Sequence, residues 1–130
     1  MRTASCSCGQ LKVTCDGEPI RISMCHCLAC QKRTGSAFAI QARWPSDRVT
    51  IEGQAHEFQR TGDEGSTATF RFCPTCGATV YWTNDSMANM IAVPVGAFAD
   101  PTFPPPRVVV YTGRRHPWAT MPELEVEEIY

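Results

Sequence analysis

Eight cysteines are the residues of this chain whose type and spacing point most directly to chemistry. They stand at positions 6, 8, 15, 25, 27, 30, 73 and 76, and seven of them fall into groups with gaps of one or two residues. Sulfurs so close in sequence converge on one point, which a metal ion requires and a framework of long-range disulfides does not. The amino-terminal residues show no apolar stretch typical of an export signal. We therefore expect metal ligands in a cytoplasmic protein, where thiols stay reduced.

The first group joins two pairs of cysteines, and each pair is followed at once by a glycine. In a metal-binding knuckle the backbone after the second cysteine often turns through positive φ, which glycine adopts without strain. Four thiolates make a closed tetrahedral shell, so this site is expected to be structural, with zinc as its ion and iron as the alternative. Its ligands are Cys6, Cys8, Cys73 and Cys76.

The second group is Cys25, Cys27 and Cys30, which has no matching pair elsewhere in the chain. Three protein ligands and one exchangeable position are typical of a zinc ion that binds substrate. His26 is expected to face away from this ion, because successive side chains of an extended segment point to opposite sides. The alternative is a second structural site, completed by Cys15, His56 or His116; Cys15 is otherwise expected in the core.

The elements that must position these residues are mainly strands. Apolar and polar residues alternate in nine short segments, whereas no stretch of about 12 residues keeps a helical period. A single helical turn is expected at 31–35, and a proline-rich surface crossing at 100–106. The expected strands cover 11–15, 20–24, 38–44, 49–51, 56–60, 67–72, 78–82, 90–95 and 108–111.

Length and composition fit one globular domain spanning 1–130, with the motif-bearing region at about 5–122. The chain has 130 residues, of which 43% are hydrophobic and 19% are charged. Its net charge is −1, whereas a nucleic-acid binder normally carries a basic excess, so no nucleic acid is expected as a partner. No apolar run approaches the roughly 20 residues needed to cross a bilayer, so no membrane partner is expected.

Three motifs resemble one known family. They are Ser-Cys-Ser-Cys-Gly at 5–9, Cys-His-Cys-Leu-Ala-Cys-Gln-Lys-Arg-Thr-Gly-Ser at 25–36, and Arg-Phe-Cys-Pro-Thr-Cys-Gly-Ala at 71–78. Together with the stretches at 95–101 and 116–118, they look like the glutathione-dependent formaldehyde-activating enzymes, a family that includes centromere protein V. The resemblance implies a β-tent fold, in which two layers of antiparallel strands are pinned by zinc. It also implies two zinc ions per chain, one structural and one catalytic, with the same division of cysteines.

The activity that the resemblance implies is the condensation of glutathione with formaldehyde to S-(hydroxymethyl)glutathione, a carbon–sulfur lyase reaction viewed in reverse. A small thiol, with glutathione as the first candidate, is then the expected partner. A thiol bound to zinc loses its proton and can attack the aldehyde carbon. The candidates for further catalytic groups are His26, Lys32, Arg33 and His116. Lys32 and Arg33 also fit a solvated surface, and the segment at 117–118 is expected to pack on a sheet.

Two other functions fit the same residues. One is a zinc-stabilised binding module that performs no catalysis. The other is a redox-sensitive zinc protein, because a site made of three thiolates can lose its metal on oxidation.

Overall fold

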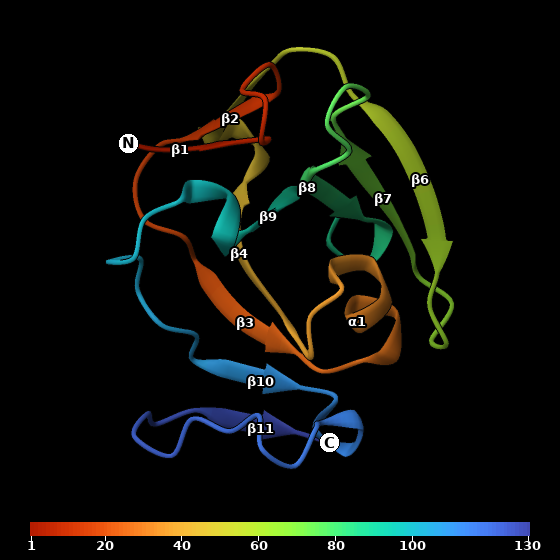
Figure 1. The fold of residues 1–130 in the computed structure, drawn as a ribbon, viewed down its shortest axis with the longest axis vertical. Coiled ribbons are helices and arrows are strands. Elements are labelled where there is room, and N and C mark those ends of the chain that lie inside the picture. The colour runs from red at the N-terminus through yellow and green to blue at the C-terminus, as the bar shows by residue number, and fades with distance from the viewer.

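The computed structural model describes residues 1–130 and contains eleven short strands in two sheets. The smaller sheet is antiparallel, with its strands in the order β1-β2-β5. These strands are β1 (Arg2–Ser5), β2 (Lys12–Cys15) and β5 (Val49–Glu52). Figure 1 shows β1 and β2 side by side near the N-terminus, and their pairing runs from Arg2 opposite Cys15 to Ser5 opposite Lys12.

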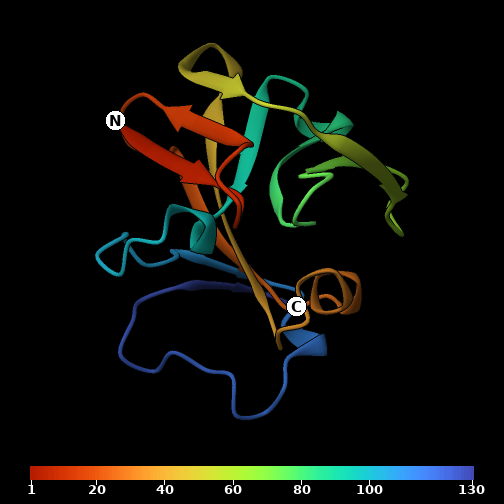
Figure 2. The same ribbon diagram turned by 45° about the horizontal axis from the view of Figure 1, so that its top comes forward.

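The larger sheet has eight strands in the order β11-β10-β3-β4-β9-β8-β7-β6. Its strands are β3 (Arg21–Cys25), β4 (Ala39–Pro45), β6 (His56–Thr61), β7 (Thr67–Phe72), β8 (Thr79–Asn84), β9 (Met90–Pro94), β10 (Val108–Val110) and β11 (Glu127–Ile129). The sheet bends, so that β6, β7 and β8 form one wing and β4, β3 and β10 another (Figures 1 and 2). The mainly β architecture expected from the alternation is confirmed.

The only α-helix is α1 (Leu28–Thr34), and it begins immediately after the second cysteine group. Cys27 caps it: its sulfur accepts a hydrogen bond from the N–H of Cys30 at 3.3 Å. At the other end Gly35 adopts φ 69°, which closes the last turn. Four short 3-10 segments complete the secondary structure, at Ser46–Arg48, Asp85–Met87, Val95–Phe98 and Thr112–Arg114. None of these helices has the length and apolar character that spanning a bilayer requires.

The main core lies between the small sheet and the middle of the large one. Trp44 belongs to this core and is fully buried, and its indole N–H donates to the carbonyl of Gly17 at 3.1 Å. Cys15 belongs to this core, as expected, and makes no part of a cysteine group. The buried residues of this cluster are Ala4, Cys6, Leu11, Val13, Cys15, Ala42, Trp44, Cys73, Val80, Tyr81, Ile91 and Val93.

Four expectations need correction. Strands β1 and β11 were not expected, because β1 buries only one side chain and β11 buries none, so neither shows clear alternation. Pairing is not antiparallel throughout: β10 runs parallel to both β3 and β11. The helix runs from Leu28 to Thr34, whereas a single turn was expected at 31–35. Trp118 does not pack on a sheet, since its side chain is 71% exposed.

Candidate metal centres and the adjoining cavity

The four-cysteine group comes from two loops that are distant in sequence. Sγ atoms of Cys6, Cys8, Cys73 and Cys76 all lie within 4.8 Å of one another. Cys8 Sγ is 3.6 Å from Cys6 Sγ and 3.6 Å from Cys73 Sγ. A tetrahedral zinc ion with Zn–S bonds of about 2.3 Å places its sulfurs about 3.8 Å apart. The donor set and its spacing therefore fit one metal ion, whereas a disulfide would need about 2.05 Å between sulfurs.

The two loops share one backbone pattern. Cys6 N–H donates to Leu11 O at 3.0 Å, and Cys73 N–H donates to Ala78 O at 3.0 Å, five residues on in both cases. The glycine after each pair has positive φ, at 84° for Gly9 and 81° for Gly77. Such a repeated turn aims backbone N–H groups at sulfur, which stabilises a thiolate.

Polar donors around Cys73 favour its ionised form. Burial alone raises the pKa of this thiol, but hydrogen bonds from the N–H groups of Cys76 and Thr75 and from the Gln10 amide lower it to about 5. These donors lie 3.4, 3.3 and 3.0 Å from Cys73 Sγ. The group thus contains a sulfur that is prepared to bind a cation at neutral pH.

The three-cysteine group is built by the end of β3 and the start of α1. Cys25 and Cys30 are buried, Cys27 is half-buried, and their sulfurs lie within 4.8 Å of one another. The group contains no histidine. Hydrogen bonds from Cys25 and Cys27 lower the pKa of Cys30, and the positive charges of Arg33 and Arg60 lower it further. This cluster can hold a metal ion through three ligands.

This second cluster lines a cavity of about 710 Å³ between the two wings of the large sheet. The far wall comes from β6, β7 and β8 and includes Phe70 and Trp82. On the near wall, β4 alternates: Ala42 and Trp44 enter the main core, whereas Gln41 and Arg43 line the cavity. The cavity therefore has a polar, basic wall facing one that carries Phe70 and Trp82 together with Arg60, and the three thiols line it as well.

The basic wall contains a pair of like charges. Arg21 and Arg43 are directly opposite each other in the β3–β4 register, and both line the cavity. Burial lowers the pKa of Arg43, and the charge of Arg21 lowers it further. Like charges directly opposite each other destabilise a sheet, and neither guanidinium forms a salt bridge in the structure. Such a pair is suited to binding an anion.

Polar groups on the floor of the cavity surround Ser23, which is buried. Gln41 Nε2 and an Arg43 NH group donate to Ser23 Oγ at 3.0 and 3.3 Å. Gln41 Oε1 is buried without a hydrogen-bond partner. A buried acceptor of this kind costs about 1–3 kcal/mol when it stays unpaired, so the floor offers an acceptor for a ligand N–H group.

The four further candidates lie in different places. Lys32 is exposed and does not line the cavity. His116 Nε2 lies 2.9 Å from Gln31 Oε1 and is also outside the lining. His26 is fully buried and lines a separate cavity on the other face of β3. Arg33 is the one beside the cysteines: its guanidinium stacks on Trp82 and Phe70, 4.5 and 5.0 Å from the ring centroids, next to Cys30.

Several lining residues were not expected from the sequence. They are Arg21, Gln41, Arg43, Arg60, Glu64, Tyr111 and Arg114. The sequence did contain a signal for Arg21 and Ser23. They lie four and two residues before Cys25 on one strand, and alternate residues of a strand face the same side of the sheet. Residues from the β6–β7 turn carry no such signal, because only the bend of the sheet brings them to the cysteines.

The fold and the two clusters define a β protein with two sites able to hold metal ions. A model of the family described as glutathione-dependent formaldehyde-activating enzyme matches residues 1–114, and the chain belongs to this family. Among solved structures, the fold is similar to the crystal structure of a Rhodobacter sphaeroides protein, with a TM-score of 0.59 and 17% identity. That match covers 98% of this chain and 99% of the other. The expected family is thereby confirmed.

Proposed function

We propose that this protein is a zinc-dependent enzyme of the carbon–sulfur lyase type. It binds a small anionic thiol, with glutathione as the first candidate, and activates it toward formaldehyde or a related electrophile. Family membership supports this assignment. The observation that carries it is that three convergent cysteines and two neighbouring arginines without a salt bridge line one cavity. We place the protein in the cytoplasm, where thiols stay reduced.

The metal ions are assigned by ligand number. Cys6, Cys8, Cys73 and Cys76 would hold a structural zinc ion, and Cys25, Cys27 and Cys30 would hold the second. A zinc ion in the second site supplies positive charge that lowers the pKa of a thiol entering its open position. Arg33, stacked on two aromatic rings beside Cys30, adds positive charge without occupying that position.

The remaining lining residues bind and orient the thiol. Glutathione carries two carboxylates and one ammonium group, and arginines recognise carboxylates through paired N–H donors. Arg21 and Arg43 bind one carboxylate, which relieves their mutual repulsion, and Arg60 binds the other. The unpaired Gln41 Oε1 accepts a hydrogen bond from the ammonium group. These contacts hold the thiol sulfur next to the cysteines.

In the reaction, the thiol loses its S–H proton, its sulfur forms a bond to the carbonyl carbon, the C=O π bond breaks, and the oxygen takes up one proton. Thiol and aldehyde together therefore have the same atoms and electrons as the hydroxymethyl product, and no oxidant or reductant is needed. Tyr111 is the lining group that we assign to this proton exchange. Its hydroxyl donates to Glu64 at 3.0 Å, and burial, followed by that hydrogen bond, raises its pKa to about 12, so it stays protonated at neutral pH.

Exchange spectroscopy by NMR on a mixture of glutathione and formaldehyde tests catalysis, because the uncatalysed exchange rate is measured in the same sample. The wild-type protein is expected to accelerate the exchange. The Cys27→Ser variant is expected to bind one zinc ion instead of two. In its presence the exchange should proceed only at the uncatalysed rate. Cys15→Ala, which alters a core cysteine outside both clusters, serves as the matched control. Equal rates with the wild type and Cys27→Ser would reject catalysis and favour a binding module.

A second measurement tests the anionic substrate. Arg43→Gln should raise the Kd for glutathione about tenfold or more, since it removes a charge-assisted hydrogen bond. The Kd for N-acetylcysteamine, a neutral thiol, should stay unchanged. Arg107→Gln, at an exposed position outside this cavity, is the charge-matched control. Weaker binding of both thiols would show that the substitution only disturbs the fold, and would contradict the assigned role.

A further inference from the structure

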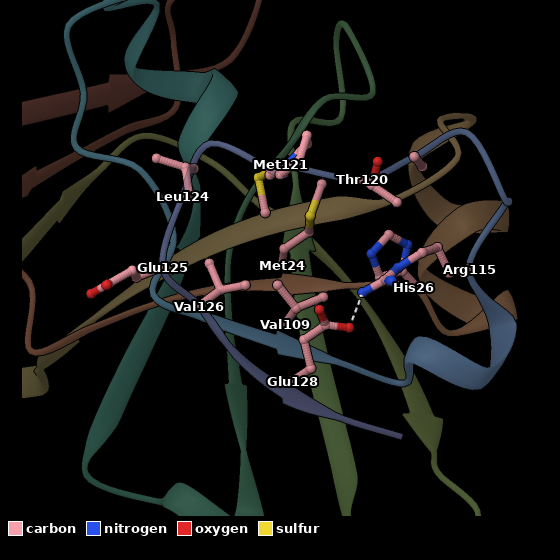
Figure 3. A pocket seen from close by; sticks show the side chains of 12 residues that line it. Met24, His26, Val109, Arg115, Thr120, Met121, Leu124, Glu125, Val126 and Glu128 are labelled. Carbon is pink, nitrogen blue, oxygen red and sulfur yellow. Dashed lines mark hydrogen bonds and ion pairs between the residues drawn. The ribbon is translucent and has the colours of Figure 1, made fainter.

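A second cavity lies on the opposite face of β3 from the cysteines. Figure 3 shows the side chains that line it. It has a volume of about 580 Å³, within the usual range for small-molecule sites. Met24, His26 and Val109 form its sheet side. The other side is Arg115, Ala119, Thr120, Met121, Pro122, Leu124, Glu125, Val126 and Glu128. The family match ends at residue 114, so this whole side lies beyond it.

Two side chains in this cavity have buried nitrogen atoms without a hydrogen-bond partner. His26 is 0% exposed, and neither of its ring nitrogens has a hydrogen bond. Arg115 Nε is also buried without a partner, while an Arg115 NH₂ group pairs with Glu128. Imidazole carries at least one N–H donor in either protonation state. Figure 3 shows the His26 ring and the Arg115 side chain projecting into the same end of the cavity, with the Glu128 pair marked beside them.

Unsatisfied donors of this kind are costly, at about 1–3 kcal/mol for each buried group. Two of them facing one space therefore indicate an acceptor that is shared between them. Both are N–H groups, and one belongs to a permanently charged guanidinium, so the best acceptor is an anionic oxygen. Glu128 accepts a hydrogen bond from an NH₂ group of the Arg115 guanidinium and so holds this side chain in place. The Nε–H group of Arg115 stays free for the acceptor.

Apart from Thr120 and the exposed Glu125, most of the remaining lining is apolar. Met24, Val109, Met121, Leu124 and Val126 line the cavity, and Figure 3 shows the two methionine side chains projecting into it. Methionine side chains adapt their shape to a flexible apolar ligand. A charged tail would lose its hydration against these apolar side chains. The tail of the ligand should therefore be hydrocarbon.

We propose that this cavity binds a small monocarboxylate with an apolar tail, such as a medium-chain fatty acid. The carboxylate accepts hydrogen bonds from Arg115 Nε–H and from His26, and the tail lies against Met24, Val109 and Met121. The site requires neither metal cluster, so it is independent of the proposed enzymatic function.

Methyl groups of methionine report on both cavities at once. Met24 and Met121 line the proposed carboxylate site, whereas Met87 lines the cysteine cavity. We expect octanoate, added to the 130-residue protein labelled with [methyl-¹³C]methionine, to shift Met24 and Met121 with a Kd of about 1 mM or lower. Met87 should not shift. No saturable shift at Met24 and Met121, or a shift at Met87 alone, would overturn the proposal.

Two substitutions with opposite expected effects separate recognition from folding. Arg115→Gln should weaken octanoate binding about tenfold or more, because a charge-assisted donor is lost, and should leave binding of 1-octanol unchanged. Glu128→Gln keeps a side-chain oxygen that can accept from Arg115 but removes a like charge near the ligand, so it should strengthen octanoate binding several-fold. Arg107→Gln is the control outside the cavity. If Arg115→Gln leaves octanoate binding unchanged, or if both cavity variants weaken it equally, the assigned carboxylate contact is wrong.

Discussion

The four-cysteine cluster should contribute to stability mainly as a crosslink. The free energy of this stabilisation can be estimated from the length of chain that the crosslink closes. Cys8 and Cys73 are separated by 65 residues in sequence, yet their sulfurs are 3.6 Å apart. Closing a loop of that length in the unfolded chain corresponds to about 4 kcal/mol at 25 °C in the loop-entropy treatment. Domains of this kind have unfolding free energies of about 5–15 kcal/mol. Loss of the crosslink should therefore leave the fold marginal.

The perturbation is Cys73→Ala, measured by urea unfolding in zinc-containing buffer and again with a strong chelator. Chelator should lower the wild-type free energy of unfolding by about 4 kcal/mol or more, because intrinsic metal binding adds to the loop term. Cys73→Ala should already lack that stability without chelator. Chelator should lower the unfolding free energy of Cys73→Ala further only by removing metal from the second site. The expected ligands of that site span Cys25–Cys30, and closing so short a loop corresponds to about 2 kcal/mol.

Cys15→Ala is the matched control for this experiment, since Cys15 is equally buried in the same core and belongs to neither cluster. It should lose only the packing of its sulfur and should keep the full response to chelator. The crosslink argument is refuted if chelator destabilises Cys73→Ala and Cys15→Ala by the same amount. It is refuted equally by a wild type whose unfolding free energy does not change when metal is removed.

Two further outcomes are expected. In urea unfolding, Gly53→Ala should destabilise the fold by at least about 2 kcal/mol more than Gly65→Ala. Both glycines have positive φ, so the backbone strain is similar. A Cβ at Gly53 would lie 2.0 Å from the Gln10 carbonyl oxygen, whereas a Cβ at Gly65 would have no atom within 4 Å. Equal losses would contradict the steric argument. For Tyr111, burial and then the hydrogen bond to Glu64 raise the pKa from 10.0 to about 12. Because the folded state holds this proton more tightly, its stabilising contribution is present below pH 10 and is lost as the pH rises toward 12. An absorbance titration at the tyrosinate band should show a late phase that Tyr111→Phe removes, and no change on that substitution would contradict the assignment.

The sequence predicted the strands that bury one face, because burial leaves a period of two in the order of residues. Segment 67–72 is an example, with Ala68 and Phe70 buried between partly exposed neighbours. Strand β11 follows no such rule: its three residues are all exposed, and it is held by pairing with β10. The parallel placement of β10 beside β3 depends on the path of the whole chain, which local periodicity does not describe.

The cysteine groups were predictable because their members are close in sequence and metal geometry restricts the spacing. The cavity beside them was not. Its far wall is supplied by Arg60, Phe70 and Trp82, and these approach the cysteines only because the eight-stranded sheet bends. The opposed pair Arg21 and Arg43 likewise depends on the β3–β4 register, which can be assigned only once the two strands are known to be neighbours.

The pairing of β10 with β3 also determines the order in which the molecule can be completed during synthesis. Residues 108–110 dock beside residues 23–25, which the ribosome releases more than eighty positions earlier. Until then the nascent chain carries an open strand edge next to Cys25, Cys27 and Cys30, and Val109 and the C-terminal segment do not yet cover Met24 and His26. Contacts of such long range form slowly, so this wing of the sheet is the part most exposed to mispairing with other chains before translation ends.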